Sequence, residues 1–147
     1  MTSQNPMDIL RDLADKKLND TVTHLGKMRQ EHAQASNQLA SLENYQREYS
    51  QQMQACITGK GMTVVDLLSH QSFINSLSQV ITHQTRQVAL CETSVDNAIG
   101  AWRKDKQRLN AFDTLKQRAD IARLLLENRR DQKMMDEFAQ RATRRSS

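Results

Sequence analysis

The chain has 147 residues, of which only 4 are Gly and 1 is Pro, and its net charge is +4. A globular domain ordinarily has roughly 7 % Gly and 5 % Pro, so this chain lacks the turn residues that a sheet fold needs. Aromatic residues make up 4 %, which excludes a large aromatic core, yet 37 % hydrophobic residues are too many for a simply disordered chain. These proportions predict an all-α fold of long amphipathic helices.

The first helix is expected over residues 6–57. Pro6 suits the first turn of a helix, where its missing N–H is not needed, and Asn5 is a good N-cap residue before it. Residues 1–5 are polar, and we expect them to be frayed. Gly26 lies inside this helix and Gly100 inside the next; each marks either a weak point or a close approach of another segment.

A turn is expected over residues 58–62, because Gly59 and Gly61 stand two residues apart. Thr63 then caps a second helix over 63–142, with Asp66 three residues later in an arrangement that resembles a capping box. Residues 143–147 form a C-terminal tail, so the chain is expected to be a single coiled-coil domain over 1–147.

Apolar residues recur at heptad spacing in both helices, which is typical of a coiled coil. In the first helix the two columns are Leu18, Leu25, His32, Leu39, Gln46, Met53 and Thr21, Met28, Ala35, Leu42, Tyr49, Cys56. In the second they are Leu67, Ile74, Ile81, Val88, Val95, Trp102, Leu109 and Leu77, Gln84, Cys91, Ala98, Asp105, Phe112. The polar members His32, Gln46, Gln84 and Asp105 weaken the seam but can fix its register.

One short turn predicts an antiparallel hairpin with a longer second helix. If the turn is centred near residue 60, residues 6–57 pair with 63–114, and residues 115–142 have no partner in the chain. This unpaired stretch still has apolar residues, so it needs a partner. It also belongs to the basic part of the chain: residues 101–147 hold 13 basic and 7 acidic residues, against 8 and 10 in residues 1–100. A basic helix indicates an acidic partner, or else only a solvated face.

A second feature is a stripe of apolar and aromatic residues on the turn half of the hairpin. Gln38, Leu42, Tyr45 and Tyr49 share one side of the first helix. Phe73, Leu77, Val80 and Gln84 share one side of the second, and the predicted pairing places the two stripes side by side. They either thicken the seam or anchor a partner, since Tyr and Phe are typical interface residues.

No motif for catalysis, phosphate binding or metal binding is present, and the four His do not have ligand spacing with either Cys. We therefore expect no enzyme and no cofactor. Cys56 and Cys91 are expected to be reduced and not to face each other. No segment is apolar enough to span a membrane and no signal peptide begins the sequence, so a cytoplasmic location is expected.

The segment from Asp131 to Ala142, DQKMMDEFAQRA, resembles the C-terminal signature of the flagellar FliJ family. The segments WRKDKQRL (102–109), LRDLA (10–14) and 38–49 are also similar to that family. The resemblance covers nearly the whole chain.

This resemblance implies a cytoplasmic component of the flagellar type III export apparatus, peripherally associated with the inner membrane. Family members are antiparallel two-helix coiled coils similar to the gamma stalk of rotary ATPases. They bind the hexameric flagellar export ATPase with their joined ends inside the ring. They also contact the cytoplasmic linker of the membrane export gate and escort empty export chaperones.

Carried over residue by residue, the resemblance implies a gate-contacting surface that consists of Gln38, Leu42, Tyr45, Tyr49, Phe73 and Leu77. The surface extends toward Val80 and Gln84. The residues expected to contact the ATPase ring are Arg129, Arg130, Lys133, Met135 and Phe138. Neither nucleic-acid binding nor direct membrane insertion is expected of this family.

Two other interpretations stay open from the residues alone. The first is a basic coiled coil that binds nucleic acid, although the basic residues alternate with acidic ones and Trp102 alone makes no stacking platform. The second is a generic structural coiled coil that dimerises through residues 115–142.

Overall fold

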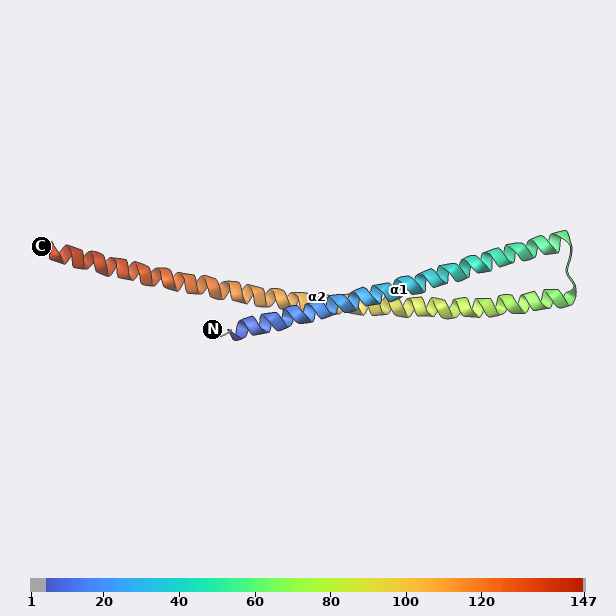
Figure 1. The fold of residues 1–147 in the computed structure, drawn as a ribbon, viewed down its shortest axis with the longest axis horizontal. Coiled ribbons are helices and arrows are strands. Elements are labelled where there is room, and N and C mark those ends of the chain that lie inside the picture. Colours follow the sequence, from blue (N-terminus) through green and yellow to red (C-terminus); the bar gives the residue numbers. More distant parts are fainter. Residues whose placement is uncertain (1–4, 147) are drawn as a thin grey trace. The chain divides into compact units, whose positions relative to one another are not determined.

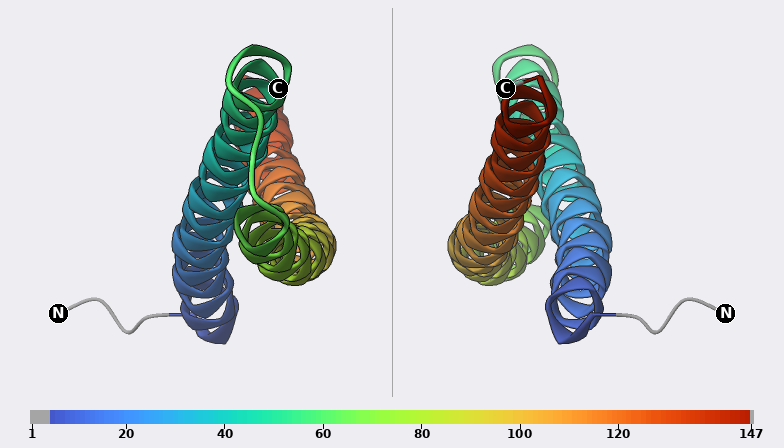
Figure 2. Two further views of the ribbon diagram at one scale, coloured as in Figure 1. Left: turned by 90° about the vertical axis from the view of Figure 1, so that its right-hand side faces the viewer. Right: turned by 90° about the vertical axis from the view of Figure 1, so that its left-hand side faces the viewer.

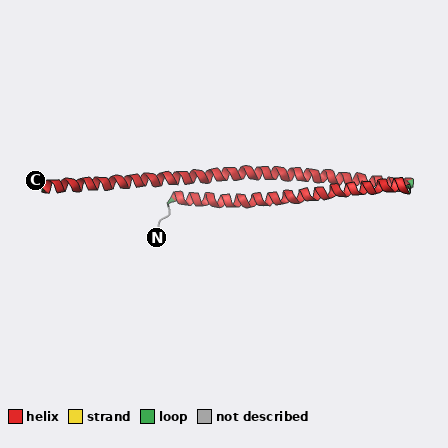
Figure 3. Ribbon diagram, turned by 90° about the horizontal axis from the view of Figure 1, so that it is seen from above, coloured by secondary structure: helices red, strands yellow, loops and turns green. Residues whose placement is uncertain are grey.

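The computed structural model describes residues 5–146. Residues 1–4, expected to be frayed, and Ser147, the last residue of the expected tail, lie outside the described residues. The described chain forms two helices, α1 (Pro6–Gly59) and α2 (Val64–Arg145), and no strand (Figures 1 and 3). The predicted all-α hairpin with a longer second helix is confirmed.

Helix α1 begins where the sequence predicts. The Asn5 side-chain Oδ1 accepts a hydrogen bond from the Met7 N–H at 3.2 Å, and the Asn5 carbonyl accepts one from the Asp8 N–H at 2.9 Å. Pro6 is the first helical residue, so the position that lacks an N–H is one that needs no intrahelical partner.

The connection between the helices consists of residues 60–63, and Figure 2 (left) shows it running from the end of α1 to the start of α2. The Cys56 carbonyl accepts hydrogen bonds from the N–H groups of Lys60 and Gly61, both at 3.1 Å. Gly61 has a φ of 73°, which favours Gly because it has no Cβ. The Thr63 Oγ1 then accepts from the Asp66 N–H at 3.2 Å and caps α2.

Residue contacts divide the chain into two units. In one unit, residues 20–103, the second part of α1 and the first part of α2 pack antiparallel on either side of the turn. In the other unit, the first residues of α1, up to Asn19, pack antiparallel against α2 from Lys104 onward. The single domain expected over 1–147 stays a prediction.

In both units the packing follows the heptad seam. Buried or half-buried residues recur at alternating spacings of four and three from Met7 to Met53 in α1 and from His70 to Phe112 in α2. The least exposed side chains lie at these positions: Ala14, Ala35, Leu77, Ala98 and Asp105. Cys56 and Leu67, expected in the seam, are exposed. Both lie near the connection, where turn geometry rather than side-chain packing sets the helix ends.

Three of the polar seam residues make interhelical interactions. The Gln46 Nε2 donates to the Ser78 Oγ at 3.1 Å, the Gln84 Nε2 donates to the Ala35 carbonyl at 3.0 Å, and the Asp105 carboxylate lies 3.8 Å from the Lys17 Nζ. These partners lie where the predicted turn near residue 60 requires. A shift of register would leave polar groups of the seam without their partners.

Ion pairs join the start of α1 to α2. The Lys116 Nζ lies 3.1 Å from the Asp8 carboxylate, and the Arg11 guanidinium hydrogen-bonds the Asp113 carboxylate. That hydrogen bond, together with the negative charge of Asp113, raises the pKa of Arg11 above its ordinary value. All four side chains are partly exposed, so these pairs set alignment more than they add stability.

No other segment packs closely against the two interior glycines. A Cβ built on Gly26 or on Gly100 would meet nothing within 4 Å. The interpretation as close-approach sites is therefore wrong, and both positions are weak points of their helices.

The arm, residues 114–145 of α2, continues beyond the seam, and all of its side chains are exposed. Lys116, near its start, still pairs with Asp8 of α1. In Figure 1 the arm continues beyond the first turn of α1 in the same unit. If the seam spacing continued beyond Phe112, its positions would be mostly charged: Lys116, Ala119, Arg123, Leu126, Arg130, Lys133 and Glu137. The apolar seam of the paired helices therefore does not continue in the same phase into the arm.

Candidate partner-binding surfaces

The aromatic patch, Gln38, Leu42, Tyr45, Tyr49, Phe73 and Leu77, contains three rings in mutual contact. The Tyr49 and Phe73 ring centroids are 4.8 Å apart, and the Tyr45 centroid lies 6.4 Å from that of each. The structure thus brings together rings from α1 and α2 that are far apart in the sequence. Contacts of this kind stabilise by roughly 0.5–1.5 kcal/mol beyond area burial.

Exposure divides the patch into two layers. Gln38, Tyr45 and Phe73 are exposed, as is neighbouring Val80, whereas Leu42, Tyr49 and Gln84 are half-buried. Leu77 is only 8 % exposed, so it supports the surface from within the seam and offers a partner almost no area. The exposed layer is the part that a partner can contact directly.

A shallow groove lies at the Gln38 end of the patch. It has a volume of about 450 Å³ and is lined by Asn37, Gln38, Ser41, Leu42 and Gln84. The Gln84 Nε2, besides its bond to the Ala35 carbonyl, donates to the Gln38 Oε1 at 3.2 Å. Amide groups are therefore presented beside the aromatic rings, which suits a partner with both apolar and hydrogen-bonding groups.

The arm presents the other predicted contact residues. Met135 is 72 % exposed and Phe138 is 74 % exposed, and the three basic residues Arg129, Arg130 and Lys133 are exposed too. Helical spacing places Met135 and Phe138 on one side of α2 and Arg130 with Lys133 on another. The structure therefore does not gather the five residues on one face.

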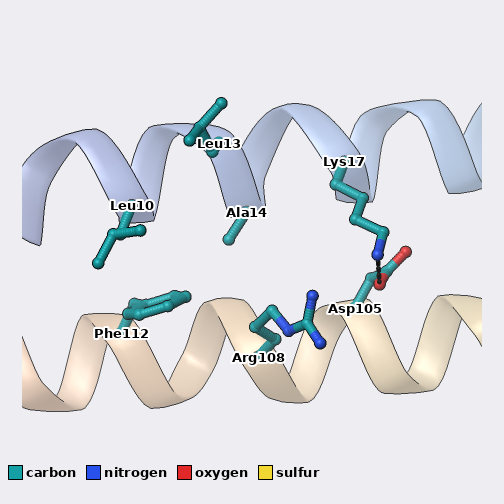
Figure 4. Close-up of a pocket in the computed structure, with 7 residues that line it drawn as sticks. All are labelled: Leu10, Leu13, Ala14, Lys17, Asp105, Arg108 and Phe112. Atoms are coloured by element: carbon teal, nitrogen blue, oxygen red, sulfur yellow. Dashed lines mark ion pairs between the residues drawn. The ribbon is translucent and has the colours of Figure 1, made fainter.

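A groove that the sequence did not reveal lies in the unit containing the start of α1. It has a volume of about 250 Å³, and Figure 4 shows Leu10 and Phe112 facing each other across it. The remaining lining residues are Leu13, Ala14, Lys17, Asp105 and Arg108. The sequence feature that could have predicted this groove is a seam alanine flanked by leucines, because a small side chain at a seam position leaves space between its larger neighbours.

In residues 5–146, no group of three His, Cys, Asp or Glu side chains could hold a metal ion. Cys56 is exposed, Cys91 is half-buried, and both are free. Neither helix, as far as it is described, contains a stretch long and apolar enough to cross a membrane.

These observations define a two-helix coiled-coil protein whose second helix continues as an exposed, basic arm. Residues 3–147 match the family model described as "Flagellar FliJ protein". The chain is 41 % identical over 145 residues to the flagellar FliJ proteins of Escherichia coli (strain K12) and of Salmonella typhi, covering 99 % of this chain and 98 % of each relative. The chain therefore belongs to the FliJ family, a component of flagellar protein export.

Proposed function

We propose that the protein acts as a central stalk for the flagellar export ATPase and couples that hexamer to the membrane export gate. The observation that carries the proposal is the arm, a helix of more than thirty residues whose side chains are all exposed. Exposed apolar side chains on this scale indicate a binding surface. The arm would enter the ATPase ring through Arg129, Arg130, Lys133, Met135 and Phe138.

The distribution of side chains around the arm supports a partner that encloses it. A partner docking on one face of a helix would need one apolar stripe. The arm has an apolar side only in part: Leu124 lies on the side of Met135 and Phe138. The cations lie mostly on the opposite side, and Leu126 lies among them. A ring that contacts a helix from several directions uses all of these groups.

The aromatic patch is proposed to bind the cytoplasmic linker of the export gate. Tyr45 is 50 % exposed and Phe73 is 41 % exposed, and both rest on the half-buried Tyr49 ring. Rigid aromatic side chains supported from beneath are typical anchors of protein interfaces. This proposal places the protein in the cytoplasm, peripherally associated with the inner membrane through its partners.

Escort of empty export chaperones is proposed on family membership alone. Nucleic-acid binding has less support, because acidic residues accompany the cations of the arm. The Arg123 guanidinium, for example, lies 2.9 Å from the Asp120 carboxylate.

The test is co-purification with the export ATPase and measurement of its ATP turnover. The full chain should stimulate turnover, and deletion of residues 131–147 should abolish the stimulation while the paired helices keep their unfolding midpoint. Arg129→Glu with Arg130→Glu should reduce stimulation, more strongly at low salt. Arg29→Glu, an exposed charge change on α1, is the matched control. Unchanged stimulation after the deletion contradicts the stalk proposal.

A further inference from the structure

We infer that His70 is a positioning residue of the aromatic patch, which holds the Tyr49 phenol so that the Tyr45 and Phe73 rings form a fixed binding surface. The Tyr49 hydroxyl hydrogen-bonds the His70 Nδ1, and the two ring centroids are 5.7 Å apart. His70 is outside the set of residues assigned to the gate contact. The inference rests on the proposed gate-binding function.

The position of the two residues explains why such a tie is needed. His70 is the first half-buried seam position of α2, and Leu67, the preceding seam position, is 41 % exposed. On α1 the seam ends at Met53, which is the next seam position after Tyr49. Little packing therefore holds Tyr49 on the side nearest the connection. Because its ring contacts both Tyr45 and Phe73, a displaced Tyr49 would displace the exposed rings as well.

The chemistry of the contact favours orientation over packing. An aliphatic side chain at this seam position would bury more apolar surface than an imidazole. A neutral imidazole with an unprotonated Nδ1 accepts a hydrogen bond from the phenol O–H, whereas a protonated imidazole donates one from Nδ1–H to the phenol oxygen. The tie therefore holds in either protonation state of His70. Gln84 acts in parallel at the other end of the patch, since it is a polar seam residue that holds Gln38.

The test measures the affinity of the full chain for the cytoplasmic linker of the export gate by calorimetry. His70→Leu places an apolar residue at this seam position and should preserve helicity, but it should weaken binding by about three- to tenfold, as expected for one hydrogen bond. His70→Gln retains a polar group and should restore most of the affinity. On a Tyr49→Phe background, His70→Leu should have almost no further effect. His83→Leu, at an exposed His of α2, is the matched control.

Two results would overturn the inference: wild-type affinity in His70→Leu, or an equal loss of affinity when the Tyr49 hydroxyl is already absent. If the wild-type chain does not bind the linker, the proposed gate function fails, and the tie is then tested on its own. Nitrogen NMR of the His70 ring should show the Nδ1 resonance shifting in Tyr49→Phe. An unshifted resonance means that the tie does not exist.

Discussion

Helix α2 contains two stretches that differ in whether their apolar side chains are covered. Between His70 and Phe112, apolar side chains recur at alternating spacings of four and three and are covered by α1. In the arm, residues such as Leu125 (55 % exposed) and Met135 (72 %) are open to solvent. The two stretches belong to one continuous helix, so helix formation alone does not distinguish them.

The comparison shows that the phase of the apolar residues, rather than their presence, decides which stretch pairs. In the first stretch the apolar residues repeat every 3.5 positions on average and form one seam. In the arm those positions are taken largely by Lys, Arg and Glu, and the apolar residues lie elsewhere around the helix. Helix α1 follows the phase of the seam, so it is not matched to such a surface.

The largest expected effect comes from the same truncation made in each stretch. Leu77→Ala removes a side chain that is 8 % exposed, and it should lower the free energy of unfolding by about 2–3 kcal/mol. Leu125→Ala removes a side chain that is 55 % exposed, and it should change that free energy by less than about 0.5 kcal/mol. Urea unfolding followed by circular dichroism measures both.

Equal destabilisation by the two truncations would break the comparison, because it would mean that the arm is packed in solution. Sedimentation would then show whether a second copy of the chain covers it, as the interpretation of a generic dimerising coiled coil requires.

Much of the fold could be predicted from the sequence, because heptad spacing and helix caps are local signals. Asn5, Thr63 and Gly61 set the helix ends, and the register followed from the turn. The opening of the seam beyond Met53 could not be predicted, because a heptad pattern identifies a face but does not show how far two helices stay together. The tie between His70 and Tyr49 depends on side-chain rotamers, which residue spacing does not specify.

Polar residues should behave differently in the two stretches as well. The Asp105 side chain is 9 % exposed, whereas the side chain of its ion-pair partner Lys17 is 59 % exposed. Asp105→Leu should therefore raise the free energy of unfolding by about 1–2 kcal/mol, because the buried carboxylate is replaced by apolar area and Lys17 returns to water. Asp136→Leu in the arm should leave the unfolding midpoint unchanged. A loss of stability in Asp105→Leu would show that the ion pair contributes more than apolar packing at this layer.

The smallest expected effect concerns helix propensity. Gly100 lies in the paired stretch with nothing within 4 Å of a built Cβ, so Gly100→Ala should raise the free energy of unfolding by about 0.5–1 kcal/mol. Gly61→Ala should lower the free energy of unfolding by about 1 kcal/mol, because Gly61 has a φ of 73°.

Ala122→Gly makes the opposite substitution, alanine to glycine, in the arm. It should reduce the helical signal in circular dichroism without moving the midpoint, since the arm has no tertiary packing through which a local loss of helix could destabilise the paired helices. A shifted midpoint in Ala122→Gly would mean that the two stretches unfold as one cooperative unit.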